Sequence, residues 1–106
     1  MDLNEYQDKA ATYKVAGTSP LERAFGLCEE VGEVFGVLKR MERGDFAGNI
    51  GEFGARLHKE LGDTLWYLSQ VAADNNWTLN DIAETNLDKL ESRKIRGTIL
   101  GVGDNR

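Results

Sequence analysis

Two short acidic phrases in this chain nearly repeat each other. LCEEVGE occupies Leu27–Glu33, and LHKELGD occupies Leu57–Asp63. Each phrase ends with two acidic residues three positions apart, a spacing that puts both side chains on one side of an α-helix. Carboxylates gathered in this way have the oxygen ligands that hard divalent cations prefer. The two phrases therefore indicate a site for a metal ion between two helices.

The position of these acids on a helical wheel supports that interpretation. Glu30 falls inside an apolar arc about 120° wide, and Glu33 lies about 40° beyond the edge of that arc. Glu60 and Asp63 occupy the same two positions on the other segment. Glu29 lies about 100° from Glu30, further toward solvent. We expect the four acids Glu30, Glu33, Glu60 and Asp63 to face one interior.

Acidic residues on a helix are most often solvated surface groups, and this alternative stays open. An unpaired buried carboxylate, however, costs on the order of several kcal/mol, and four of them directed at one another would repel or take up protons. Cations would neutralise them. Ligands that are all oxygen suit Mg²⁺, with Mn²⁺ as the other candidate, and such ions also bind phosphates.

A later segment places basic groups on an apolar face in the same way. Asn86, Lys89 and Arg93 lie at helical spacing on the side that carries Leu79 and Leu90. One alternative is that these cations have no function beyond pairing with acids of their own helix, since such surface ion pairs are common and weak. The other alternative is that Lys89 and Arg93 neutralise phosphate oxygens beside the metal.

Helices must position all these groups, and the pattern predicts four of them. Their expected ranges are about 3–15, 20–43, 52 or 56 to 75, and 79–96, with Ser19 and Thr78 as caps of the second and the fourth. The glycine-rich stretch GDFAGNIGEFG predicts a loop between the second and third. Short connections favour an all-α, antiparallel four-helix bundle. We expect one domain over residues 1–106, with a mobile tail at 97–106.

Composition restricts the class of partner. The chain has 106 residues and a formal net charge of -5, which argues against a nucleic-acid surface. One cysteine excludes an internal disulfide, and no apolar run is long enough for a signal core or a membrane span. We expect a cytoplasmic protein without a nucleic-acid or membrane partner.

Together these motifs resemble the MazG-like, all-α nucleoside triphosphate pyrophosphohydrolases. Glu30-x-x-Glu33, a spacer from residue 34 to 59, and Glu60-x-x-Asp63 match the metal signature of that family. The phrases GLCEEVGEVFGVLK, ELGDTLWYLSQVA and IAETNLDKLESRK are similar to it as well. Asn-x-x-Lys-x-x-x-Arg then follows at the expected place in the fourth segment.

The resemblance implies Mg²⁺-dependent cleavage between the α- and β-phosphates of a nucleoside triphosphate, which gives a monophosphate and pyrophosphate. The four acids would be the metal ligands, and Glu33 or Glu29 the general base. Phosphate contacts would come from the fourth helix and the tail: Asn86, Lys89, Arg93, Lys94, Arg96 and Arg106. Family members assemble as dimers or tetramers, so we expect a homodimer or homotetramer, with Trp66 in a helix-to-helix interface.

Three points stay open from the sequence. The nucleobase pocket has only aromatic and amide candidates: Tyr6, Gln7, Tyr13 and Phe53, with Phe46 and Trp77 behind them. The activity could be dUTPase-like, or the chain could be a catalytically silent helical module that binds metal or a partner. The tail could close over the triphosphate with Arg106 or Arg96, or it could be a frayed end.

Overall fold

The computed structural model describes residues 1–106 and contains four α-helices and no strand. They are α1 (Leu3–Ala11), α2 (Pro20–Glu42), α3 (Ile50–Asp74) and α4 (Leu79–Arg96). The expected all-α class is confirmed. None of the helices is both long enough and apolar enough to cross a lipid bilayer.

Side-chain caps fix where the helices begin. The predicted caps are confirmed, because Ser19 accepts a hydrogen bond from the Glu22 amide and Thr78 accepts one from the Asp81 amide. The expectation of a loop over the whole stretch 44–54, with a helix only from residue 52 or 56, was wrong: Asn49 caps the Glu52 amide, and α3 begins at Ile50. The first helix ends at Ala11, earlier than the predicted residue 15.

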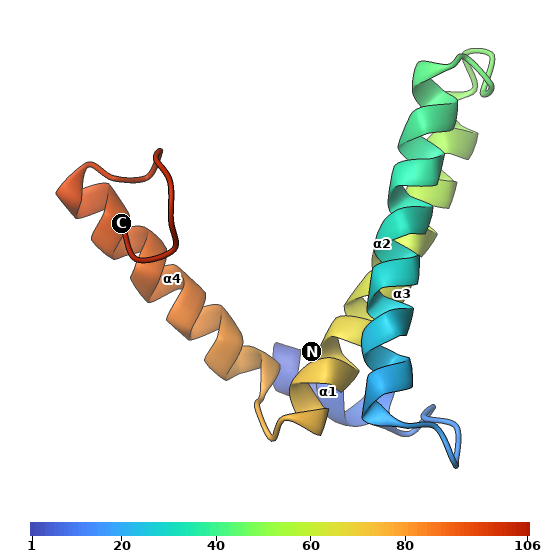
Figure 1. Ribbon diagram of the computed structural model, residues 1–106. Helices are drawn as coiled ribbons and strands as arrows, with labels where there is room; N and C mark the ends of the chain where they lie inside the picture. The colour runs from blue at the N-terminus through green and yellow to red at the C-terminus, as the bar shows by residue number, and fades with distance from the viewer.

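Helices α2 and α3 form a long antiparallel hairpin (Figure 1). At the turn of the hairpin the rings of Phe46 and Phe53 pack edge to face, with centroids 5.6 Å apart. At the other end Arg23 of α2 donates two hydrogen bonds to the Asp74 carboxylate of α3, at 2.7 and 2.9 Å. The hairpin is therefore fixed at both ends.

The short helix α1 packs across the end of α3 and holds the start of α4. Buried Gln7 donates to the carbonyls of Ser69 and Trp77, and its side-chain oxygen accepts from the Leu79 amide. The indole N–H of Trp66 donates to the Ala10 carbonyl at 3.0 Å. Trp66 thus makes a contact inside the chain, and its expected place in an interface between copies stays a prediction.

Helix α4 leaves the other helices and makes the second arm of a V, with α1 at the vertex (Figure 1). It packs on α1 and does not lie along α2 or α3. The antiparallel four-helix bundle is therefore not closed within one chain. The radius of gyration is 16.9 Å, whereas a compact domain of this length has about 13 Å. The reason is that α4, beyond its contact with α1, extends away from α2 and α3 (Figure 1).

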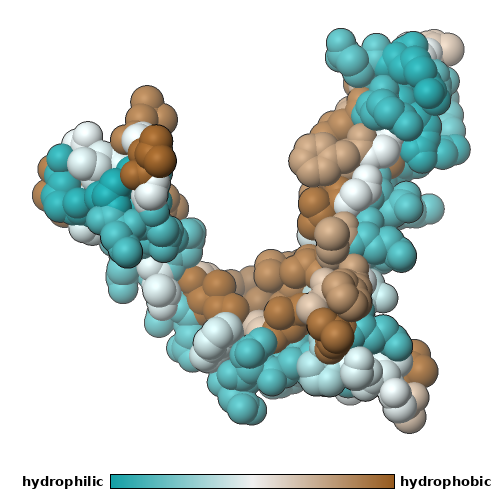
Figure 2. All heavy atoms as spheres, viewed as in Figure 1, coloured by the Kyte–Doolittle hydropathy of each residue, from teal (hydrophilic) through white to brown (hydrophobic).

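Hydrophobic residues collect on the inner side of the V, over the α2–α3 arm and the vertex (Figure 2). The arm carries exposed large apolar residues: Phe35 of α2 is 64% exposed, and Leu61 of α3 is 52% exposed. On α4, Leu87 is 64% exposed. Apolar patches of this extent mark an interaction surface.

Candidate metal centre

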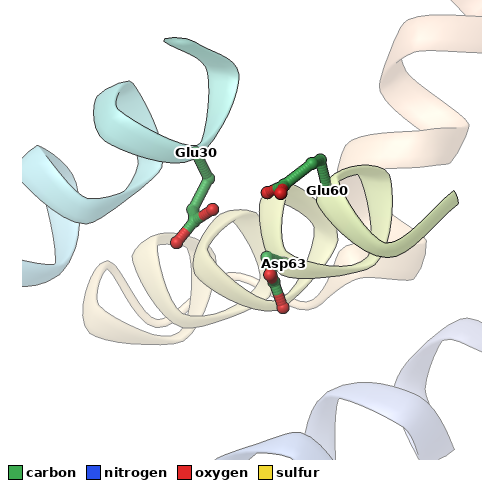
Figure 3. A group of neighbouring side chains, drawn as sticks. All are labelled: Glu30, Glu60 and Asp63. Atoms are coloured by element: carbon green, nitrogen blue, oxygen red, sulfur yellow. The ribbon is translucent and has the colours of Figure 1, made fainter. Parts of the chain in front are cut away.

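Three carboxylates converge midway along the α2–α3 hairpin: Glu30 comes from α2, and Glu60 and Asp63 come from α3 (Figure 3). One carboxylate oxygen from each residue lies within 4.8 Å of the other two. Glu30 and Glu60 are half-buried, and Asp63 is exposed. Two helices thus contribute oxygen ligands to one small volume.

A close helix crossing lies one turn away from these acids. Gly26 stands four residues before Glu30, and Tyr67 stands four residues after Asp63. A Cβ atom at Gly26 would lie only 2.2 Å from a ring carbon of Tyr67. The glycine therefore admits the tyrosine ring between the helices. Sequence reasoning missed this residue, although a glycine within the helical phrase AFGLCEE was the available signal.

The electrostatics of the cluster favour a cation. Burial raises the pKa of the Glu30 carboxyl, and the negative charges of Asp63, Glu60, Glu29 and Glu33 raise it further. No basic side chain pairs with Glu30, Glu60 or Asp63. A divalent cation would relieve this repulsion, and a set of carboxylate oxygens suits a hard ion.

Glu33 and Glu29, the expected fourth ligand and alternative base, lie outside the group of three. Both are exposed, and neither has an oxygen within the 4.8 Å set. Their charges still act on Glu30. Their roles as ligand or general base stay predictions.

The structure does not bring the basic residues of α4 to the acids of the same chain, because α4 diverges from the hairpin (Figure 1). Lys89 and Arg93 instead hold the carboxylate of Asp104, at 2.9 and 3.2 Å. Asn86 lines a groove of about 390 Å³ together with Lys89 and Trp77. Sequence reasoning missed the pairing with Asp104.

Three further basic residues were expected to contact phosphate: Arg96, Arg106 and Lys94. Arg96 donates to the Ser92 hydroxyl and to the Arg106 carbonyl. Arg106 donates to three backbone carbonyls of its own segment. Lys94 is exposed and makes no ion pair. A phosphate contact by any of them stays a prediction.

Of the four nucleobase candidates, Tyr6 has a phenol whose pKa is shifted. Burial raises this pKa, and the negative charge of Asp63 raises it further. The amide group of Gln7 is used in hydrogen bonds to backbone groups, as described above. Phe53 belongs to the aromatic pair at the hairpin turn, and Tyr13 is 69% exposed beyond the end of α1.

Comparison with known proteins agrees with this arrangement. The family model for the MazG nucleotide pyrophosphohydrolase domain matches residues 19–96, which contain all three clustered acids. The chain is 41% identical over 81 residues to the Gene 37 protein of Mycobacterium phage L5, a match that covers 76% of this chain and 71% of the phage protein. No solved structure gives a significant match. The chain belongs to the MazG nucleotide pyrophosphohydrolase family.

Proposed function

We propose that this protein hydrolyses nucleoside triphosphates between the α- and β-phosphates, and that it releases a monophosphate and pyrophosphate. The observation that carries the proposal is the convergence of Glu30, Glu60 and Asp63 within 4.8 Å, inside the segment that matches the family. The biological role would be removal of unwanted nucleotides from the cytoplasmic pool.

Mg²⁺ is the proposed cofactor, with Mn²⁺ as a substitute, and Glu30, Glu60 and Asp63 are its proposed ligands. When bound, the ion would polarise the phosphoryl group and make an attacking water more acidic. The chain itself would supply a carboxylate base, Glu33 or Glu29, beside the ligand set. The raised pKa of Glu30 supports a cluster that gains from a cation.

We further propose that the working form is a homodimer or homotetramer. Large apolar side chains are exposed on the helices of both arms, including Phe35, Leu61 and Leu87, and hydrophobic residues gather on the inner side of the V over the α2–α3 arm and the vertex (Figure 2). Glycines 32 and 62 face open space, so another helix could approach closely there. The cations of α4 could then reach the acids of a second copy, which one chain does not allow. Light scattering after size exclusion would measure the mass in solution.

Incubation with a panel of nucleotides and Mg²⁺, followed by identification of the products, tests the activity. The expected products are the monophosphate and pyrophosphate in equal amounts. Release of orthophosphate without pyrophosphate would contradict the choice of bond. Exclusive turnover of dUTP would identify the dUTPase-like activity, and absence of turnover for every nucleotide would favour the silent helical module.

A further inference from the structure

The last nine residues fold back along α4 as a closed loop, which we call the return loop (98–106). The guanidinium of Arg106 donates to the carbonyls of Thr98, Ile99 and Gly103, at 3.1, 2.8 and 2.6 Å. Arg96 of α4 donates to the carbonyl of Arg106 at 2.8 Å. The loop is therefore held in shape by its own arginine and attached to the helix by another.

This shape places one carboxylate on two cations of α4. The Asp104 carboxylate pairs with Lys89 at 2.9 Å and with Arg93 at 3.2 Å, and Arg93 also donates to the Asp104 carbonyl. Hydrogen bonding from Lys89, followed by the positive charge of Lys89, lowers the pKa of Asp104. The carboxylate is therefore ionised at neutral pH, and it neutralises the cations that the family pattern assigns to phosphate.

Another anion could replace the Asp104 carboxylate on these two cations. The side chain of Asp104 is 75% exposed, whereas that of Arg93 is only 7% exposed. Nε of Arg93 on α4 and the hydroxyl of Thr98, the first residue of the loop, are buried without a hydrogen-bond partner. The arginine thus has donor capacity that Asp104 leaves unused. A phosphoryl group offers three acceptor oxygens and more charge than one carboxylate, and it would use that capacity better.

We propose that Asp104 is a built-in competitor of the nucleotide, a carboxylate that occupies Lys89 and Arg93 until the phosphoryl oxygens of a nucleotide displace it and the return loop. The inference rests on the proposed function for the class of ligand. It makes the loop an autoinhibitory element, and it predicts the opposite movement from a tail that closes over the substrate.

Binding of inorganic tripolyphosphate, measured by calorimetry without divalent ions, tests the competition. Asp104→Asn should bind about threefold more tightly than Asp88→Asn, since the two changes remove the same charge from the α4 arm. Asp88 is exposed and makes no ion pair, so it is the matched control. A chain that ends at Leu100 should show the same gain as Asp104→Asn. Equal affinities of the two Asn variants, or no tripolyphosphate binding by any form, would overturn the proposal.

Hydrogen exchange measured with and without tripolyphosphate tests the movement. Amide exchange in residues 98–106 should rise when tripolyphosphate binds, because the loop is displaced. A fall in exchange would overturn the proposal in favour of closure. The two hypotheses can fail separately. If nucleotides are hydrolysed but the two Asn variants bind tripolyphosphate equally, the proposed function stands and the competition by Asp104 is wrong. If Asp104→Asn binds more tightly but no nucleotide is hydrolysed, the competition stands and the proposed function is wrong.

Discussion

Gly26 of α2 lies against one edge of the ring of Tyr67 of α3, where a Cβ atom would come within 2.2 Å of a ring carbon. The contact is one helical turn from Glu30 on α2 and one turn from Asp63 on α3. Because the helices run antiparallel, their separation at Gly26 also determines how closely these two carboxylates approach. A packing feature in the hairpin thus controls the geometry of the candidate metal centre.

Gly26→Ala should weaken divalent-ion binding and lower stability. Forcing a methyl group against the ring costs about 1–3 kcal/mol, and the better helix propensity of alanine returns about 1 kcal/mol. Gly54→Ala is the control, since this helical glycine has open space around it. Chemical denaturation and Mn²⁺ titration of both variants measure the difference. Equal stability and equal Mn²⁺ affinity would show that the crossing does not position the acids.

Gln7→Met should destabilise the chain by about 1–3 kcal/mol, because the Leu79 amide and two carbonyls lose their buried partner. The preference among nucleotides should not change, since Gln7 serves the junction of α1, α3 and α4. Urea unfolding and relative kcat/KM values for two nucleotides test both parts. A stable variant with altered nucleotide preference would instead support the role in base recognition that the sequence suggested.

The ion pair between Arg23 and Asp74 should make stability depend on acid pH. Hydrogen bonding from Arg23 is the largest cause that lowers the pKa of Asp74 below its usual 3.8. A lowered pKa in the folded chain stabilises it above about pH 3.8, and this contribution disappears as the pH falls through the folded value. Asp74→Asn should therefore melt several degrees lower at pH 7, with a gap that narrows below pH 3.8. A gap that stays constant from pH 7 to pH 2.5 would contradict this account.

Tyr6→Phe should retain the fold and raise KM without a large change in kcat, if the phenol contacts bound nucleotide, as the sequence suggested. Burial raises the pKa of this phenol, and the charge of Asp63 raises it further. Tyr13→Phe is the control, because Tyr13 lies exposed beyond α1. Steady-state kinetics of both variants decide this. Identical KM values for the two would remove Tyr6 from the substrate site.

Local signals predicted the helices well. Ser19 and Thr78 were recognisable as caps because each is a short hydroxyl residue directly before a segment with helical apolar spacing. At that position the hydroxyl accepts a hydrogen bond from a free backbone amide of the first turn. The start of α3 was placed too late because the glycines there argued against a helix. Asn49 caps this first turn, and Phe53 packs on Phe46, which together offset the weak propensity of glycine.

Tertiary placement was harder to predict. A helical wheel relates Glu30 to its own helix, and it anticipated that Glu30, Glu60 and Asp63 come close together, although Asp63 is exposed and not interior. It does not reveal what covers an apolar face, so it could not show that α4 leaves the hairpin. The contact of Asp104 with Lys89 and Arg93 depends on the path of the return loop, which no periodicity describes.

The central claim is that Glu30, Glu60 and Asp63 hold the divalent ion that hydrolysis requires. Its most direct test measures Mn²⁺ affinity and nucleotide turnover on the same preparations of the wild type, Glu60→Gln and the control Glu91→Gln. We predict that Glu60→Gln loses at least about tenfold in Mn²⁺ affinity, or about 1.4 kcal/mol, and loses turnover, while its helicity is unchanged. Glu91→Gln should match the wild type in both. Wild-type Mn²⁺ affinity and turnover in Glu60→Gln would contradict the assignment of this metal centre.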